Sequence, residues 1–356
     1  MRKANQPTGW RDRGGPSQPL LLVRGLKKHF PAKGRLFAGR REMVQAVDGI
    51  SFSVMKGTTL GIVGESGCGK STTARLLMYL IEPDAGDIVF DGDGVGDPHG
   101  ISVRELRLQM QMQMVFQDSY SSLNPRATVG DIIAFGPRTA KGLAPRAARE
   151  RAERLLDQVG LSPALFSRRY PHELSGGQRQ RVNIARALAL EPRLLILDEA
   201  VSALDKSVEA QILNLLADLR RDLNLTYLFI SHDLNVVRHV SNRVVVMYLG
   251  RIVEAGEAGA IFRRPRHPYT QALLRAMPSM DPDRRTAVSP LSGDPPNPIN
   301  PPSGCRFRTR CAFAEAVCAQ VAPTLDTIGS DHDVACHMMV PSSGHSRAET
   351  PIAADD

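Results

Sequence analysis

One short stretch of the chain, residues 64–71, combines the residue types that bind phosphate groups. Its sequence, GESGCGKS, has a glycine, four further residues, a second glycine, a lysine and a serine, which is the spacing of phosphate-binding loops. Glycines let backbone amides turn inward, lysine supplies a positive charge, and a serine hydroxyl can bind Mg²⁺. We therefore predict a phosphate and Mg²⁺ site at Gly64, Glu65, Ser66, Gly67, Cys68, Gly69, Lys70, Ser71 and Thr72.

The segments on either side of this loop are those that such a loop requires. Residues 59–63 are an apolar run with the bulk of a buried strand, and residues 71–80 favour a helix that ends near Pro83. The N-terminal dipole of that helix also attracts an anion. The alternative, a glycine-rich turn that fits the spacing by accident, does not call for strand, loop and helix in this order.

A pair of carboxylates forms the second candidate site. Asp198 and Glu199 end the apolar run LLIL at residues 194–197. A carboxylate at that position can reach a Mg²⁺ ion already bound by Ser71, and its neighbour can orient or deprotonate a water molecule. Acids commonly end buried strands, so this pair points to chemistry only in combination with the phosphate loop upstream.

A third candidate site is the stretch LSGGQRQR at residues 174–181. Ser175 and two glycines directly precede a predicted helix, and they offer a hydroxyl, bare backbone amides and a positive helix dipole to an anion. The alternative is an ordinary helix N-cap. It explains Ser175 but gives no reason for Gly176, Gly177, Gln178 or the two arginines.

The rest of the chain alternates between predicted strands and helices. Strands are expected near residues 20–30, 85–90, 194–198 and 226–230, a strand pair at residues 46–57, a strand with packed methionines near residue 112, and a hairpin turning at Gly250. Helices are expected at residues 144–161, after Ser175, and after Asp205, which could cap its helix. This alternation predicts an α/β fold with a mostly parallel sheet covered on both faces.

Charge and composition set limits on location and partners. The net charge of +8 comes from residues 1–41, which hold eleven basic residues and one acidic residue, so the remainder is near neutral at −2. The basic leader could meet anionic lipid or nucleic acid, or be a solvated, partly disordered segment. The sequence has neither an apolar run long enough to span a membrane nor the apolar centre of a signal peptide. We therefore expect a cytoplasmic location.

Together these motifs resemble those of ABC transporter ATPases. The resemblance covers about residues 20–340 and is carried by residues 64–71, Gln117, LSGGQ at 174–178, LLILDE at 194–199, SALD at 202–205 and His232. It implies a P-loop NTPase fold with a mostly parallel sheet, an antiparallel β part, a helical subdomain and a small Cys-containing C-terminal domain. It also implies a head-to-tail dimer in which each ATP lies between one phosphate loop and the partner's LSGGQ stretch.

The resemblance further implies a role for each matching residue. Lys70 and Ser71 would hold phosphates and metal, Asp198 would hold Mg²⁺, and Glu199 would be the general base. Gln117 would link metal and water to the membrane partner, and His232 would contact the γ-phosphate. The LSGGQ residues Ser175, Gly176, Gly177 and Gln178 would act on the opposite nucleotide, and Asp205 would lie at the dimer seam. Phe30 would stack on adenine, with Phe37 as its rival for this role.

Three stretches resemble the peptide-importer branch of that family, which takes up dipeptides, oligopeptides or nickel. They are residues 114–126, 262–278 and 304–318, although Ser119 stands where family members usually have proline. The implied protein is an ATPase on the cytoplasmic face of the membrane, with two transmembrane permease subunits, a second ATPase subunit and, indirectly, a solute-binding protein as partners. The alternatives are import of nickel or another small solute, a soluble ABC ATPase acting on nucleic acid or ribosomes, and, weakest, a non-enzymatic interaction protein.

Four cysteines near the C-terminus form a candidate metal site. Their number suits a [4Fe–4S] cluster or Zn²⁺, and some relatives with this tail resemble iron–sulfur proteins, which favours the cluster. His332 and His337 are possible ligands in the zinc version, and reduced thiols packing a small domain are the third possibility. Cys68, inside the phosphate loop, receives no redox role. The four cysteines are Cys305, Cys311, Cys318 and Cys336.

These features divide the chain into four expected parts. Residues 1–18 are a basic disordered leader, residues 19–262 a nucleotide-binding domain with a helical subdomain at about 118–190, residues 263–340 a C-terminal region with the cysteines, and residues 341–356 a disordered tail. A linker rich in proline, serine and aspartate runs from residue 278 to residue 302.

Overall fold

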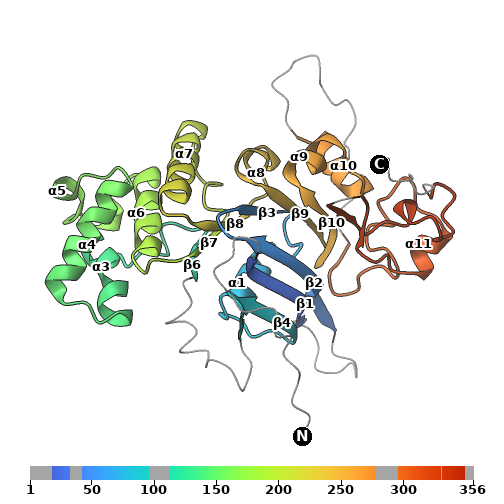
Figure 1. Ribbon diagram of the computed structural model, residues 1–356, viewed down its shortest axis with the longest axis horizontal. Coiled ribbons are helices and arrows are strands. Elements are labelled where there is room, and N and C mark those ends of the chain that lie inside the picture. The colour runs from blue at the N-terminus through green and yellow to red at the C-terminus, as the bar shows by residue number, and fades with distance from the viewer. Residues whose placement is uncertain (1–17, 33–41, 96–111, 278–295, 330, 349–356) are drawn as a thin grey trace, which may run out of the picture.

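The computed structural model describes residues 18–32, 42–95, 112–277, 296–329 and 331–348. The predicted leader up to residue 17, Phe37 and most of the predicted linker lie outside the described residues. Within the described part, the chain forms two sheets, with a group of helices at one end and the C-terminal region at the other (Figure 1).

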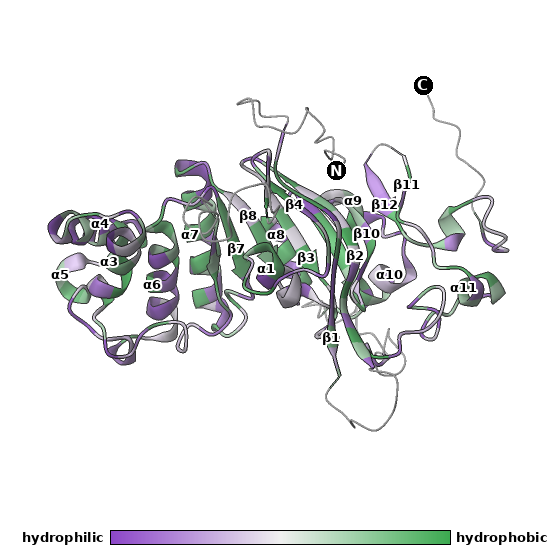
Figure 2. Ribbon diagram, turned by 90° about the horizontal axis from the view of Figure 1, so that it is seen from below, coloured by the Kyte–Doolittle hydropathy of each residue, from purple (hydrophilic) through white to green (hydrophobic). Residues whose placement is uncertain are grey.

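One side of the larger sheet consists of five neighbouring parallel strands, in the order β9-β3-β8-β7-β6, with β6 at the edge. Their bounds are Thr59–Val63 (β3), Met112–Val115 (β6), Leu194–Asp198 (β7), Thr226–Ile230 (β8) and Arg243–Tyr248 (β9). Every residue of β3, β7 and β8 is buried, as expected for parallel strands with both faces covered. Figure 2 shows these strands in the apolar colour.

Three antiparallel strands extend this sheet beyond β9: β10 (Arg251–Glu257), β12 (His332–Val334) and β11 (Asp326–Thr327). The hairpin between β9 and β10 turns at Leu249 and Gly250, whose φ angles of 43° and 79° are both left-handed. Two such residues match the right-handed twist of the flanking strands. The predicted hairpin at Gly250 is confirmed.

The smaller sheet is antiparallel, in the order β2-β1-β4-β5. Its strands are Pro19–Pro31 (β1), Met43–Met55 (β2), Ala85–Phe90 (β4) and Asp93–Val95 (β5). The strand pair predicted at residues 46–57 is wrong, because β2 is one continuous strand that pairs with β1 along its length. Register shifts in β1 around Gly25 accommodate this long pairing.

Helices cover one face of the larger sheet, and α1 together with the smaller sheet covers the other. Along β7, Leu195 and Leu197 belong to one apolar core, while Leu194 and Ile196 belong to the core on the other face. The predicted sheet with two covered faces is confirmed. The helices between the core strands are α1 (Lys70–Leu77), α6 (Gly176–Leu188), α7 (Lys206–Asp222) and α8 (Leu234–Val240), followed by α9 (Ala258–Arg263) and α10 (Pro268–Arg275).

The helical lobe at one end of Figure 1 consists of α3 (Val129–Ala140), α4 (Pro145–Gln158) and α5 (Pro163–Phe166), with α6 beside them. Helix α4 buries Ala148, Ala152, Leu155 and Leu156, and an ion pair between Arg146 and Glu150 forms at 2.9 Å on its exposed side. At the opposite end, α11 (Ala316–Gln320) belongs to the C-terminal region. Short 3₁₀ turns lie at Pro171–Glu173 and His337–Met339.

Two local predictions need correction. Helix α1 ends at Leu77 rather than near Pro83, because Tyr79 takes a left-handed φ of 49° and its hydroxyl donates to the carbonyl oxygen of Val95 at 2.7 Å. Asp205 does occupy the N-cap position of α7, but its side chain makes no capping hydrogen bond.

The last described residues of the predicted disordered tail contact the C-terminal region. The amide of Ser346 donates to Glu315 at 2.9 Å, and a ring nitrogen of the buried His345 lies 2.9 Å from the carbonyl oxygen of Phe313. Residues 349–356 lie outside the described residues.

Candidate nucleotide site

The candidate site lies along one edge of the larger sheet, where the parallel strands end. The phosphate loop follows β3, His232 follows β8, Asp198 ends β7, and Gln117 follows β6. Because these four strands are neighbours in the sheet, residues far apart in the sequence meet at this edge. Open α/β sheets bind ligands at the carboxyl ends of their strands.

The phosphate loop depends on two of its glycines. A Cβ atom on Gly64, whose φ is 151°, would lie 2.2 Å from the carbonyl oxygen of Met247, and one on Gly69, whose φ is 108°, would lie 2.2 Å from that of Ala46. The Lys70 side chain is buried, and its Nζ donates to the carbonyl oxygens of Gly64 at 2.7 Å and Glu65 at 3.0 Å. Lysine and loop therefore form one compact unit.

The predicted Mg²⁺ ligands Ser71 and Asp198 lie together. The Ser71 hydroxyl donates to Oδ1 of Asp198 at 3.0 Å, across 127 residues of sequence. Asp198 is only 4% exposed, and burial raises the pKa of its carboxyl group, opposed by the hydrogen bond from Ser71. A hydroxyl and a buried carboxylate are hard oxygen ligands, which fit Mg²⁺.

Glu199 is the centre of a second group of predicted residues. Its carboxylate accepts a hydrogen bond from Nε2 of Gln117 at 2.9 Å and lies 3.4 Å from Nδ1 of His232. Its φ of 49° is left-handed, an uncommon and strained conformation for glutamate. The amide of Glu199 donates to the carbonyl oxygen of Ile230 at 2.9 Å, which fixes this conformation against β8.

The LSGGQ stretch makes a different set of contacts. Ser175 caps α6: the Gln178 amide donates to its Oγ at 3.3 Å, and the Ser175 amide donates to Oε1 of Gln178 at 3.0 Å. A Cβ atom on Gly177 would lie 2.5 Å from Cγ1 of Val208, so this glycine allows α6 to pack on α7. Local contacts thus give a reason for Gly177 and Gln178, but not for Gly176, where a Cβ atom would lie 3.6 Å from Cδ2 of Leu204.

The same holds for the two arginines of the stretch. A guanidinium N–H of Arg179 donates to the carbonyl oxygen of Leu174, and Nη1 of Arg181 donates to that of Val159 at 2.6 Å. In the described part of the chain, the hydrogen bonds given for the side chains of Ser175 and Gln178 join these two residues to each other. The structure does not bring these residues to the phosphate loop of the same chain.

Phe30, the predicted adenine contact, lies on β1 and pairs with Val44 of β2. Two residues further along β2, the carbonyl of Ala46 touches Gly69 of the phosphate loop. The Phe30 ring is partly exposed, with Nζ of Lys28 at 5.7 Å from its centre. Phe30 is therefore on the strand pair that borders the loop.

The four C-terminal cysteines line one small cavity, together with His337 and His345. Burial raises the pKa of Cys305 to about 11 and of Cys336 to about 12, so these groups are protonated thiols as they stand. Among the described residues, no three His, Cys, Asp or Glu side chains are arranged to hold a metal ion. His332, a possible zinc ligand by sequence, instead lies 2.7 Å from Oε1 of Glu254.

Two residues that the sequence did not single out reach the phosphate loop. The amide of Glu65 donates to the hydroxyl of Tyr269 at 2.9 Å, and the guanidinium of Arg310 bonds both carboxylate oxygens of Glu65 at 2.7 and 3.1 Å. Both lie within the stretches at 262–278 and 304–318 that carried the resemblance to peptide importers. That resemblance was the feature of the sequence that could have pointed to these two residues.

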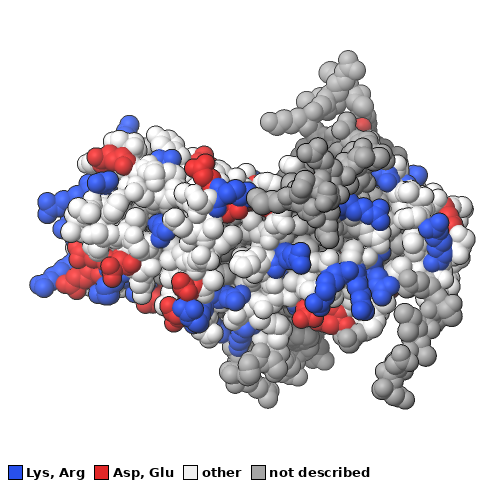
Figure 3. Space-filling model, turned by 90° about the horizontal axis from the view of Figure 1, so that it is seen from above, with Lys and Arg blue, Asp and Glu red and all other residues white. Residues whose placement is uncertain are grey.

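The surface carries charges of both signs. Over the helical lobe in Figure 3, basic and acidic side chains alternate rather than forming one basic face. No helix in the described residues has both the length and the apolar character needed to cross a bilayer.

Comparison with known proteins finds relatives that cover most of the chain. Residues 47–202 match the ABC transporter family, and residues 253–318 match the C-terminal region of oligopeptide/dipeptide transporters. A probable peptide ABC transporter ATP-binding protein of Sinorhizobium fredii is 50% identical over 95% of both chains. The oligopeptide transport ATP-binding protein AppF of Bacillus subtilis is 48% identical over 95% of this chain and 99% of its own.

Solved structures of ABC proteins have the same fold. The cbiO1 protein of Clostridium perfringens, part of an ABC transporter complex, is 28% identical with a TM-score of 0.59, covering 69% of this chain and 91% of its own. A bacterial ABC transporter cassette solved as a dimer is 25% identical with a TM-score of 0.58, covering 67% of this chain and 98% of its own. The chain belongs to the ATP-binding proteins of ABC transporters and has the ABC ATPase fold.

Proposed function

We propose that this chain hydrolyses ATP to drive uptake of short peptides through partner membrane subunits. The observation that carries the proposal is the assembly of Ser71 with Asp198, and of Gln117 and His232 with Glu199, at one edge of the sheet. The relatives named above as peptide and oligopeptide transport proteins cover 95% of the chain and supply the substrate class.

Each part of this edge has a proposed task. The amides of the phosphate loop and Lys70 bind the phosphates of ATP. Ser71, Asp198 and Gln117 hold Mg²⁺, which when bound neutralises phosphate charge. Glu199 accepts a proton from the attacking water, and His232 contacts the γ-phosphate. In the described structure Glu199 already accepts the Gln117 hydrogen bond that would orient it.

We propose that hydrolysis requires a second subunit, identical or similar, arranged head to tail. Ser175 is exposed, and the amides of Gly176 and Gly177 donate no hydrogen bond within the described part of the chain. These groups are available to a nucleotide bound by another chain, with Asp205 at the seam. Closure upon ATP binding then does mechanical work, since a ligand shifts an equilibrium only by binding one state better.

The transmembrane partners would dock beside Gln117. Several large apolar residues are exposed there and on the adjoining helical lobe, among them Phe116 at 37%, Tyr120 at 54%, Phe135 at 66% and Leu165 at 62%. Ser119 lies between the first two, and its carbonyl oxygen accepts a hydrogen bond from Asn183 of α6 at 3.1 Å. An exposed apolar group on this lobe supports peripheral attachment to a membrane complex at the cytoplasmic face.

We keep the predicted domain limits as part of this proposal: a nucleotide-binding domain at residues 19–262 with a helical subdomain at about 118–190, and a C-terminal region at 263–340.

Isolation of the chain with its membrane partners tests the function. Mass spectrometry of the captured solute should find short peptides. Captured nickel without peptide, or copurifying RNA without membrane subunits, would overturn the proposal.

We further propose that the four cysteines ligate a [4Fe–4S] cluster, a proposal supported by the single cavity that they share. The side chains as they stand do not form a metal site among the described residues, so binding requires the cysteine side chains to rearrange and to lose their protons. Protein purified without oxygen should contain about four irons per chain. Zinc without iron would assign the site to Zn²⁺, and neither metal would leave buried thiols.

A further inference from the structure

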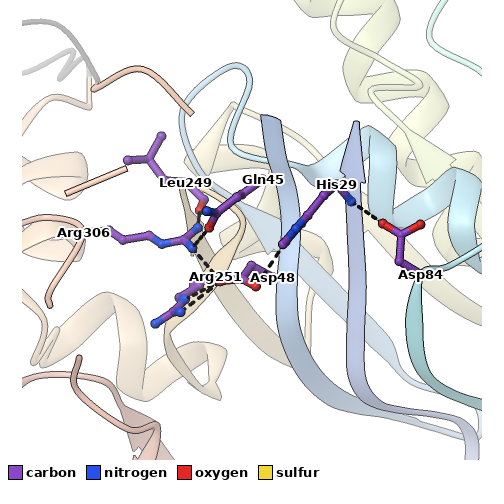
Figure 4. Close-up of polar contacts among 7 residues, drawn as sticks. All are labelled: His29, Gln45, Asp48, Asp84, Leu249, Arg251 and Arg306. Carbon is purple, nitrogen blue, oxygen red and sulfur yellow. Dashed lines mark hydrogen bonds and ion pairs between the residues drawn. The ribbon is translucent and has the colours of Figure 1, made fainter. Parts of the chain in front are cut away.

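Residues 305–311 of the C-terminal region contact the nucleotide-binding part of the chain at three points. The first is Arg306, which is 7% exposed. Its guanidinium donates to Oδ2 of Asp48 at 2.5 Å and also bonds the side chain of Gln45 and the carbonyl oxygen of Leu249. Figure 4 shows these groups, and Arg251 of β10, converging from β2, the turn before β10, β10 itself and the C-terminal segment.

Asp48 is well suited to hold this end of the segment. Arg251 donates to the same Oδ2 atom through Nε at 3.0 Å and Nη2 at 2.9 Å, and Nε2 of His29 lies 3.3 Å from Oδ1. Burial raises the pKa of Asp48, but the hydrogen bond from Arg251 and the charge of Arg306 outweigh it and leave the pKa lowered. The carboxylate therefore stays ionised between two arginines.

The second contact point is Phe307, whose buried ring completes an aromatic cluster. Its ring centre lies 5.3 Å from that of Tyr248 and 5.4 Å from that of Tyr269. Tyr269 is fully buried. Because the Tyr269 hydroxyl accepts the amide hydrogen of Glu65, this cluster reaches the backbone of the phosphate loop.

The third contact point is Arg310, whose side chain is 5% exposed and forms the bidentate pair with Glu65 described above. Glu65 is thus held through its amide by Tyr269 and through its carboxylate by Arg310. Its carbonyl oxygen in turn accepts a hydrogen bond from Nζ of Lys70 at 3.0 Å. Through this one residue, the C-terminal region is connected to the phosphate-binding lysine.

We propose that Arg310 is a positioning residue for the nucleotide site: by holding Glu65, it fixes the phosphate loop in the conformation that binds ATP. The inference rests on the proposed role of residues 64–71 in binding ATP. A two-bond fork between guanidinium and carboxylate restricts orientation in a way that a single lysine contact does not. The ATP affinity of the loop therefore depends on a residue 245 positions away from Glu65.

Equilibrium binding of Mg²⁺·ATP to the full chain tests this role. Hydrogen bonds to charged groups contribute enough that Arg310→Ala should raise Kd about tenfold. Arg310→Lys should give a Kd between those of the wild type and the alanine variant. The matched control is Arg308→Ala in the same segment, since Arg308 donates to Ser303 of the C-terminal region at 2.9 Å; its Kd should stay within twofold of wild type.

A double-mutant cycle separates positioning from general loss of structure. Glu65→Gln alone should weaken binding much as Arg310→Ala does, and the double variant should be no weaker than Arg310→Ala. A Kd for Arg310→Ala within twofold of wild type, or effects that multiply in the double variant, would overturn the inference. If the wild-type chain binds no Mg²⁺·ATP, both the proposed function and this inference are overturned.

Discussion

The edge of the parallel strands and the N-terminus of α6 present similar chemistry to an anion, but they differ in what surrounds them. At the strand edge, Ser71 meets Asp198 and Gln117 meets Glu199, joining residues 127 and 82 positions apart. At α6, the side chains of Ser175 and Gln178 form their hydrogen bonds within one helical turn, among the described residues. The fold of one chain brings the residues of the first region together from distant parts of the sequence. In the second region it leaves Ser175 exposed at the surface.

This difference is the basis of the proposal that one chain holds half of a catalytic site. The residues proposed to bind phosphate and metal lie together at the strand edge, whereas Ser175 is exposed and the amides of Gly176 and Gly177 donate no hydrogen bond within the described residues. A helix N-terminus with free amides binds an anion only when one is brought to it. In the proposed dimer, the other chain brings it.

The largest expected effect comes from removing the proposed general base, Glu199, at the strand edge. Glu199→Gln keeps the side-chain shape but removes the carboxylate that accepts a proton from water. Turnover should fall about a hundredfold or more, the usual contribution of a general base, while Mg²⁺·ATP binding persists and the dimer stays closed. Single-turnover hydrolysis and light scattering measure both, and brisk hydrolysis by the variant would remove Glu199 from this role.

Glycine substitutions compare how tightly each region is built. Gly64→Ala would meet the backbone oxygen of Met247 at 2.2 Å in a left-handed conformation, and should lower the free energy of unfolding by about 3 kcal/mol or more. Gly177→Ala meets only a side-chain methyl of Val208, and the higher helix propensity of alanine offsets part of the strain, so about 1 kcal/mol is expected. Urea unfolding of both variants should give this order; equal costs would contradict it.

Ser175→Ala tests the role of α6 beyond its own chain. Loss of the cap should cost about 1 kcal/mol of stability, leave ATP binding by monomers unchanged, and reduce hydrolysis by the assembled subunits. Thr128→Ala is the matched control, because Thr128 caps α3 through an equally long bond, 3.3 Å to the amide of Asp131. The control should show the same stability loss with no loss of hydrolysis. Equal hydrolysis in both variants would reduce Ser175 to a helix cap.

The smallest expected effect concerns the pH dependence of stability at Asp198. Burial raises the pKa of this carboxyl group above its ordinary value of 3.8, so its ionised form destabilises the folded chain at neutral pH, and this cost disappears as the pH falls below 3.8. Asp198→Asn should therefore be more stable than wild type at pH 7 without Mg²⁺, with the difference shrinking toward acid pH. Urea unfolding across this range measures it, and a difference that grows toward acid pH would contradict the assignment.

The sequence predicted what local patterns encode. The apolar runs at β3, β7 and β8, the phosphate-loop spacing and the helix after Ser175 all follow from neighbouring residue types. The early end of α1 does not follow from local patterns, because the left-handed turn at Tyr79 is fixed by a hydrogen bond to Val95 of β5, in the smaller sheet.

Long-range contacts were the other part that the sequence could not supply. Tyr269 and Arg310 reach Glu65 across 204 and 245 residues, and no local periodicity reports such a partner. Family resemblance marked their stretches as distinctive without saying what they touch. The structure adds that the C-terminal region holds the phosphate loop.

The central claim, that one chain carries only half of a catalytic site, is tested most directly by diluting the purified chain. ATP binding and ATP hydrolysis per chain are measured on the same samples, with light scattering to establish the oligomeric state. We predict that monomers bind Mg²⁺·ATP but that hydrolysis per chain falls steeply once dimers dissociate. Hydrolysis per chain that stays at its full rate in samples shown to be monomeric would contradict the account.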